Sequence, residues 1–130
     1  MKYSVIHFIK WSAPESLKYG KFSSKSDIWS FGVCVWELFS KGEMPYFTMT
    51  NAEAMEKVAT GYRLQQPKGC PDEVYKLMLS CWNEDPMERP SFEEVLNILN
   101  DLFQKIAIQN VQEQSIVTVE LSDNAEIYNN

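Results

Sequence analysis

One segment of this chain is apolar on nearly every side, and it limits the possible folds more than any other feature. A helix that is hydrophobic all round is a buried helix. Ser26 is the expected N-cap, Asp27 places negative charge in the first turn, and Gly42 is expected to end the helix. We therefore expect this helix at the centre of a helical domain, with these apolar residues: Ile28, Trp29, Phe31, Val33, Val35, Trp36, Leu38 and Phe39.

Further helices are predicted around this central one. Sequences of the capping-box type start at Ser12, Thr50 and Ser91, and each has a glutamate three residues later. Pro71 is expected to start another helix. Its apolar side chains recur at i, i+3, i+4, i+7 and i+8, which predicts one buried stripe: Val74, Leu77, Met78, Cys81 and Trp82. Strand signals are almost lacking before residue 109, so the predicted fold class is all-α.

The composition allows one modest core and excludes several classes of partner. The chain has 130 residues, of which 45% are hydrophobic, enough for a single domain. A net charge of −6 with dispersed lysines and arginines argues against nucleic acid and anionic membranes as partners. No apolar run is long enough for a transmembrane segment. Three cysteines and one histidine lack metal-ligand spacing, so we expect reduced thiols, with Cys34 and Cys81 as small buried hydrophobes.

Three motifs follow one another along the chain: residues 10–15 (KWSAPE), residues 25–33 (KSDIWSFGV), and Cys81-Trp82 followed by residues 88–92 (ERPSF). In this order and spacing they resemble the second half of a protein tyrosine kinase catalytic domain. Serine/threonine kinases usually carry a different sequence before Ala-Pro-Glu. Residues 22–27 (FSSKSD) look most like cytoplasmic non-receptor kinases of the Tec, Src or Syk type. The resemblance implies the helical lower part of the kinase C-lobe, followed by a disordered tail.

The resemblance implies an activity that this chain is not expected to perform alone. The intact parent would use ATP and Mg²⁺ to transfer the γ-phosphoryl group to protein tyrosine in the cytoplasm. The sequence has no Gly-x-Gly-x-x-Gly loop, no His-Arg-Asp triplet and no Asp-Phe-Gly triplet. Those segments would hold the nucleotide, the metal ions and the catalytic base. We therefore assign no catalytic, cofactor-binding or metal-binding residue, and expect this segment to supply the structural base and the substrate platform.

The resemblance also implies the platform residues. Ile9, Lys10, Trp11 and Ser12 resemble the floor that receives the substrate tyrosine and the residue after it. For Trp11, plain core packing is the alternative. Met55 and Val58 could also touch a substrate or partner protein, although ordinary packing is favoured for both.

Three more residues take structural roles from the resemblance. Glu15 and Arg89 are implied to form the ion pair that holds the activation segment to the loop before the last helix. The alternative is that Glu15 only completes its capping box. Asp27 is implied to anchor the backbone of the catalytic loop, and without that loop it would remain an acid at a helix terminus.

The chain is expected to have three parts. Residues 1–8 lack the proline that usually stands two positions before the Lys-Trp pair, where this chain has Phe8, and are expected not to match the family. Residues 9–106 are expected to form the partial C-lobe. Residues 107–130 read as an acidic flexible tail, because Lys and Arg are absent while Asn and Gln accumulate. Within this tail, residues 116–121 are β-prone.

Tyr128 gives the tail a candidate function. Glu126 and Ile127 precede it and Asn130 follows two positions later, a pattern that resembles sites read by phosphotyrosine-binding adaptors once phosphorylated. An unmodified tyrosine and Src-like autoinhibition are the alternatives. For the whole chain, the competing hypothesis is a non-catalytic helical interaction module with a phosphorylatable tail, and a truncated product without function is the third.

Overall fold

The computed structural model describes the backbone of residues 8–128 and the side chains of residues 8–125. Every regular element in this part of the chain is helical, so the all-α fold class is confirmed. The described residues divide into two units between Val95 and Leu96. In chain order the elements are η1 (Ile9–Trp11), α2 (Pro14–Tyr19), α3 (Ser24–Phe39), α4 (Asn51–Ala59), α5 (Asp72–Cys81), η2 (Pro86–Glu88) and α6 (Phe92–Tyr128).

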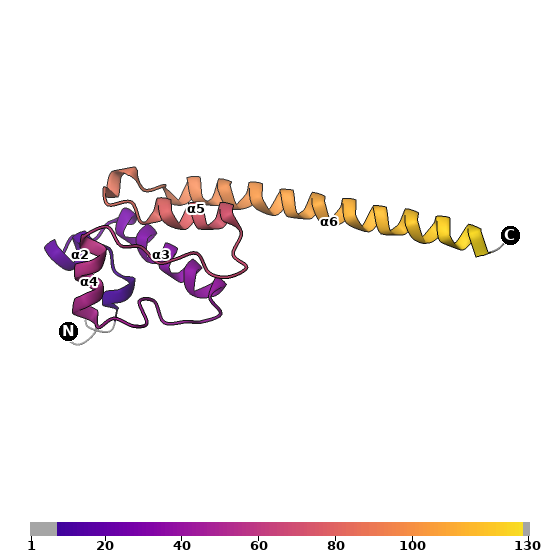
Figure 1. Cartoon of the computed structure of the whole chain (residues 1–130). Coiled ribbons are helices and arrows are strands. Elements are labelled where there is room, and N and C mark those ends of the chain that lie inside the picture. The colour runs from indigo at the N-terminus through magenta and orange to yellow at the C-terminus, as the bar shows by residue number, and fades with distance from the viewer. Residues whose placement is uncertain (1–7, 129–130) are drawn as a thin grey trace. The chain divides into compact units, whose positions relative to one another are not determined.

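The core of the first unit lies between α3 and α5, which run side by side (Figure 1). The apolar stripe predicted for α5 is buried as expected and faces the buried side chains of α3: Ile28, Trp29, Val33 and Trp36. Gly32 allows the two helices to approach closely. A Cβ atom at this position would lie 2.8 Å from Trp82 Nε1 and 2.9 Å from Cys81 Cβ.

The limits and faces of α3 differ from the prediction in two respects. The N-cap is Ser23, and Ser26 is its partner in a capping box rather than the cap itself. Cys34 is exposed, and Leu38 is 75% exposed. The prediction that this helix is buried on all sides is therefore wrong for the Cys34 and Leu38 positions. An apolar sequence predicts that a helix is buried, but it does not show which faces of the helix are in contact with other elements.

The start of α2 also differs from the prediction. The helix begins at Pro14, and its N-cap, Ala13, makes no side-chain capping bond. Ser12 Oγ instead donates to the carbonyl oxygen of Phe8 at 2.8 Å. The expected capping box between Ser12 and Glu15 is therefore absent, because both side chains bind elsewhere. The capping box predicted at Thr50 is present at the start of α4.

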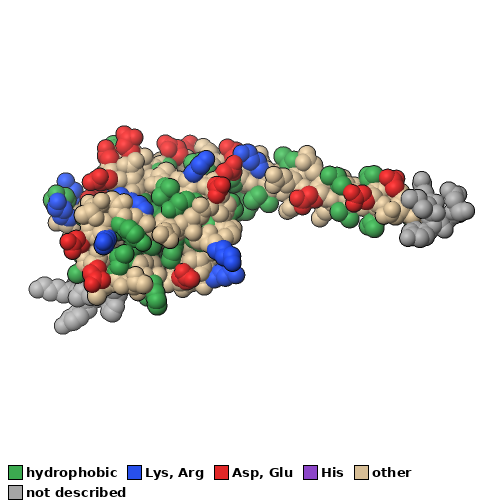
Figure 2. Space-filling model, viewed as in Figure 1, with side chains coloured by type: hydrophobic (Ala, Val, Ile, Leu, Met, Phe, Trp, Pro, Cys, Tyr) green, Lys and Arg blue, Asp and Glu red, His purple; other side chains and the backbone are tan. Residues whose placement is uncertain are grey.

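The helix α6 continues to Tyr128, whereas the composition predicted a flexible tail from residue 107 and a β-prone segment within it. The chain contains no Gly or Pro after Pro90, so no strong helix-ending residue interrupts α6. Described side chains from residue 107 onward are all exposed. Figure 2 shows acidic and hydrophobic side chains exposed along this part of α6. The helix in this second unit therefore has no buried face of its own.

Candidate functional site

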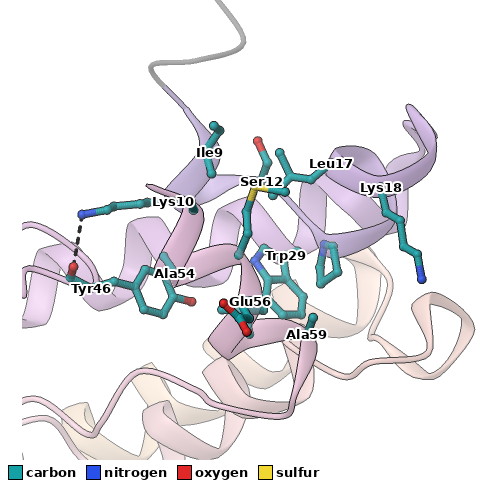
Figure 3. Close-up of a pocket in the computed structure, with 14 residues that line it drawn as sticks. Ile9, Lys10, Ser12, Leu17, Lys18, Trp29, Tyr46, Ala54, Glu56 and Ala59 are labelled. Atoms are coloured by element: carbon teal, nitrogen blue, oxygen red, sulfur yellow. Dashed lines mark hydrogen bonds between the residues drawn. The ribbon is translucent and has the colours of Figure 1, made fainter. Parts of the chain in front are cut away.

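The first unit contains a pocket of about 400 Å³. Its walls come from η1, α2, α3, α4 and the loop after α3 (Figure 3). Three of the four residues predicted as a substrate platform line it: Ile9, Lys10 and Ser12. Apolar side chains supply much of the remaining wall, among them Leu17, Trp29, Ala54, Met55 and Val58. The pocket is therefore suited to an apolar side chain.

Trp11 is the one predicted platform residue that does not line the pocket. Its indole Nε1 donates to the carboxylate of Glu37 on α3, and its ring meets Phe8 edge-on, with the ring centroids 6.4 Å apart. Ser30 Oγ on α3 donates to the carbonyl oxygen of Trp11 at 2.8 Å. These contacts attach η1 to α3. Trp11 thus joins η1 to α3 at partial burial, and its role in the substrate platform stays a prediction.

Lys10 directs its ammonium group to the loop between α3 and α4. Nζ donates to the carbonyl oxygen of Tyr46 at 3.1 Å and to that of Met49 at 2.7 Å. Tyr46 is a pocket residue that the sequence analysis missed. Burial raises its pKa to about 12, with the Arg63 charge opposing this rise and Tyr62 adding to it. Its backbone φ of +50° is left-handed, a conformation that a tyrosine does not reveal in sequence.

Glu15 and Arg89 form a two-pronged ion pair across 74 residues of sequence. Arg89 Nη2 lies 2.7 Å from Glu15 Oε1, and Nη1 lies 2.9 Å from Oε2. The guanidinium also donates to the carbonyl oxygens of Asn83 and Lys25, at 2.8 and 3.1 Å. Its carbon lies 4.9 Å from the centre of the Trp29 ring. The buried charge of Arg89 is therefore both paired and hydrogen-bonded, as buried charges must be.

Arg63 is a second, half-buried junction that no sequence pattern predicted. Nε donates to the carbonyl oxygen of Trp82 at 2.9 Å, and Nη1 donates to that of Val58 at 3.0 Å. The guanidinium carbon lies 4.9 Å from the centre of the Trp29 ring. Burial lowers the pKa of Arg63. A single arginine in a loop gives no periodic signal, so no sequence pattern pointed to this link between α4 and the end of α5.

Asp27, Cys34 and Cys81 do not line the pocket. Asp27 is exposed in the first turn of α3, and its carboxylate has no hydrogen bond to any residue that the structure describes. Tyr128 is the last residue of α6, and its side chain lies outside the described residues.

Cys81 is buried as expected, and this burial raises the pKa of its thiol to about 11. Cys34 is exposed, so its predicted burial is wrong.

The described residues do not fit ATP or Mg²⁺. Among the side chains of residues 8–125, there is no group of three His, Cys, Asp or Glu that could hold a metal ion. The sequence has no glycine-rich loop to wrap a triphosphate. We therefore derive no chemical step from this chain alone. Of the helices the structure describes, none is long and apolar enough to span a membrane.

Residues 2–99 match the protein tyrosine and serine/threonine kinase family. Since this match covers most of the chain, the chain belongs to that family. It is similar to three tyrosine kinases: 52% identical over 95 residues to the kinase SRK3 of Spongilla lacustris, 48% over 98 residues to Fer of Rattus norvegicus, and 48% over 96 residues to FRK of Homo sapiens. The predicted resemblance to non-receptor tyrosine kinases is thereby confirmed.

The similarity covers most of this chain but only part of each relative. The aligned residues make up 73%, 75% and 74% of this chain, and 28%, 12% and 19% of the three relatives. The chain therefore corresponds to part of a tyrosine kinase domain. The family match begins at residue 2, ahead of the boundary at residue 9 expected from the motifs. The three-part division of the chain stays a prediction.

Proposed function

We propose that this chain forms the structural base and the peptide platform of a protein tyrosine kinase domain. The complete cytoplasmic protein would transfer the γ-phosphoryl group of ATP to tyrosines of protein substrates. One observation carries the proposal. Three residues from the segment before Ala-Pro-Glu, Ile9, Lys10 and Ser12, line the same pocket as Met55 and Val58 of α4. The predicted substrate floor and two apolar side chains of α4 thus line the same cavity.

The chemistry available in this pocket is binding and orientation. Its apolar wall favours a hydrophobic side chain of a substrate peptide, because that side chain is removed from water when it enters the pocket. Lys18 and Glu56 carry opposite charges on the pocket lining and would meet the polar backbone or neighbouring side chains of the peptide. When bound elsewhere in the complete protein, ATP and Mg²⁺ supply the phosphoryl group and its charge neutralisation.

The other predicted residues would join this platform to the rest of the domain. The ion pair between Glu15 and Arg89 joins the start of α2 to the segment before α6, and the guanidinium of Arg89 packs on the ring of the pocket residue Trp29. Asp27, exposed at the first turn of α3, would accept hydrogen bonds from the backbone of the catalytic loop. This role is consistent with its lack of a partner among the described residues.

Peptide binding tests the platform directly. We expect the chain to bind a labelled peptide with a hydrophobic residue after its tyrosine, as a saturable rise in fluorescence anisotropy. Met55→Glu would place a charge in the pocket wall and should weaken binding about tenfold or more. Met87→Glu is the matched control, because Met87 is 78% exposed and lies outside the pocket. Equal loss in both variants, or no saturable binding by the unmodified chain, would contradict the proposal.

A second experiment tests the activity of the complete protein. An antibody against residues 113–130 would isolate the protein from its native source, for incubation with ATP, Mg²⁺ and a tyrosine-containing polymer. We expect phosphotyrosine to form only with ATP and Mg²⁺ present, together with a band well above 15.1 kDa. A single band at the mass of this chain, without phosphorylation, would favour the non-catalytic interaction module instead.

We further propose that Tyr128 is phosphorylated and then bound by a phosphotyrosine-binding adaptor. Acidic and aliphatic residues precede it, and a phosphate at this site would offer an arginine-lined pocket a doubly charged ligand. A peptide of residues 120–130 should become phosphorylated by a tyrosine kinase and then bind an adaptor domain. A Tyr128→Phe peptide is the control. A peptide that is not phosphorylated, or is not captured afterwards, would remove this role.

A further inference from the structure

The ammonium group of Lys10 closes a small turn in the loop between α3 and α4. It donates to the carbonyl oxygens of Tyr46 and Met49, at 3.1 and 2.7 Å. Within the same turn the amide of Met49 donates to the carbonyl oxygen of Tyr46 at 2.9 Å. Lys10 and this amide therefore share one acceptor. Hydrogen bonds from a charged donor are about twice as strong as neutral ones, so Lys10 is a principal restraint on the turn.

Tyr46 needs such a restraint because its backbone is left-handed. Its φ of +50° is a conformation that side chains with a Cβ atom disfavour. The side chain of Tyr46 is nevertheless buried, at 6% exposure, and forms part of the pocket wall. Figure 3 shows the side chain of Lys10 extending to the backbone oxygen of Tyr46. The position of this wall thus depends on a backbone conformation that is unfavourable by itself.

We propose that Lys10 is a positioning residue that sets the shape of the peptide pocket by holding Tyr46 in place. This inference deepens the proposed function and rests on it. Lys10 does not offer its charge to the peptide, because the loop carbonyls already bind its ammonium group. Its influence passes through the turn from Tyr46 to Met49. Without the lysine charge the turn relaxes, the wall moves, and the pocket loses its discrimination between side chains.

The first test measures the turn itself by amide hydrogen exchange, read by NMR at the amide of Met49. Lys10→Met keeps the length of the apolar stem and removes the donor. We expect exchange at Met49 to become about tenfold faster or more, the loss expected for a charge-assisted hydrogen bond. Lys10→Arg should restore most of the protection. Lys57→Met is the control, because Lys57 is exposed on α4 outside the pocket.

The second test measures discrimination with two peptides that carry isoleucine or glycine after the tyrosine. The preference of the unmodified chain for isoleucine should fall about tenfold in Lys10→Met, and persist in Lys10→Arg and Lys57→Met. Unchanged preference together with unchanged Met49 exchange overturns the inference. Failure of the unmodified chain to bind either peptide refutes the proposed function instead. The exchange experiment then still decides whether Lys10 holds the turn.

A third measurement covers the case in which Lys10→Met does not fold. The ammonium protons of Lys10 can be detected by NMR in the unmodified chain. Two hydrogen-bonded protons should exchange slowly enough to be observed and should couple to the carbonyl carbons of Tyr46 and Met49. An ammonium signal that behaves like that of an exposed lysine, such as Lys57, would overturn the inference without any variant.

Discussion

Arg89 shows how a single side chain connects distant parts of the first unit. At 2% exposure it binds Glu15, which lies 74 residues away, and rests against Trp29. Removing one partner of a buried ion pair leaves the other charge stranded. Removing Arg89 should therefore lower the free energy of unfolding by more than the loss of a surface salt bridge, which costs about 0–1 kcal/mol.

Arg89→Ala is accordingly expected to lower the free energy of unfolding by about 3–5 kcal/mol. Urea titration followed by tryptophan fluorescence measures this change. The free energy of unfolding of Arg89→Lys should lie between those of the unmodified chain and Arg89→Ala, because lysine keeps the charge but cannot form a bidentate pair with the carboxylate. Lys68→Ala, at an exposed loop position, is the control and should change stability by less than about 0.5 kcal/mol. Equal midpoints for Arg89→Ala and the control would show that the pair is not structural.

Two buried groups predict a loss of stability at alkaline pH. Burial raises the pKa of Tyr46 from 10.0 to about 12, and that of Cys81 from 9.0 to about 11. The unfolded chain therefore releases these protons at lower pH than the folded chain does. The contribution of these two protonated groups to the free energy of unfolding is therefore complete below pH 9 and is lost as the pH rises towards 12.

We expect the urea midpoint to be steady up to about pH 9 and then to decline, from the pKa values above. Tyr46→Phe removes the phenol and should flatten the part of this decline that lies between pH 10 and pH 12. Tyr19→Phe is the control, because Tyr19 is 63% exposed, and it should keep the decline of the unmodified chain. A midpoint that stays constant from pH 9 to pH 12 would contradict the role assigned to both groups.

Between elements, the contact of α3 with α5 depends on the absence of a side chain at Gly32. Gly32→Ala would bring a methyl group within 3 Å of both Cys81 Cβ and Trp82 Nε1, which are buried. We expect a destabilisation of about 1–3 kcal/mol, the usual cost of overpacking a core. Cys34→Ala, at an exposed position of the same helix, should stay within about 0.5 kcal/mol. Urea titration measures the unfolding midpoint of both variants. Equal midpoints would show that α3 and α5 can move apart to accommodate the methyl group without loss of stability.

Sequence reasoning located the elements better than it located their ends. The buried stripe of α5 and the capping box of α4 follow from local spacing, so they could be predicted. The start of α3 could not, because Ser23 and Ser26 are both suitable caps and only the folded turn shows which one takes that position. Exposure of Cys34 depends on which helices cover α3, and this information is not local to the segment.

For the molecule as a whole, the site was predictable only where the family resemblance supplied it. Spacing alone gives no reason to connect Glu15 with Arg89, since local rules do not reach across 74 residues. Tyr46 and Arg63 were missed because their roles arise from backbone conformation and from carbonyl contacts. Neither property leaves a pattern of residue types. Lys10 was predicted as a platform residue from the resemblance, but its contact with the loop carbonyls could not be predicted from the sequence.

The continuous core between α3 and α5 predicts cooperative unfolding of the first unit. Tryptophan fluorescence reports on this unit alone, because the tryptophans are Trp11, Trp29, Trp36 and Trp82. A single sigmoidal urea transition is the expected result, and it would show that the unit folds without additional chain. A sloping signal without a transition would mean that the segment depends on the rest of a kinase domain for its packing.

The long helix of the second unit gives the last prediction. Described side chains from residue 107 onward are exposed, so this part buries too little apolar surface to contribute to the core. Removing residues 107–130 should therefore lower the helical signal in far-ultraviolet circular dichroism while leaving the urea midpoint of the tryptophan signal unchanged. Removing residues 92–130 is the comparison, because it also takes away buried Val95 and should lower the midpoint. If the shorter deletion lowered the midpoint equally, the tail would be part of the folded unit rather than an appended helix.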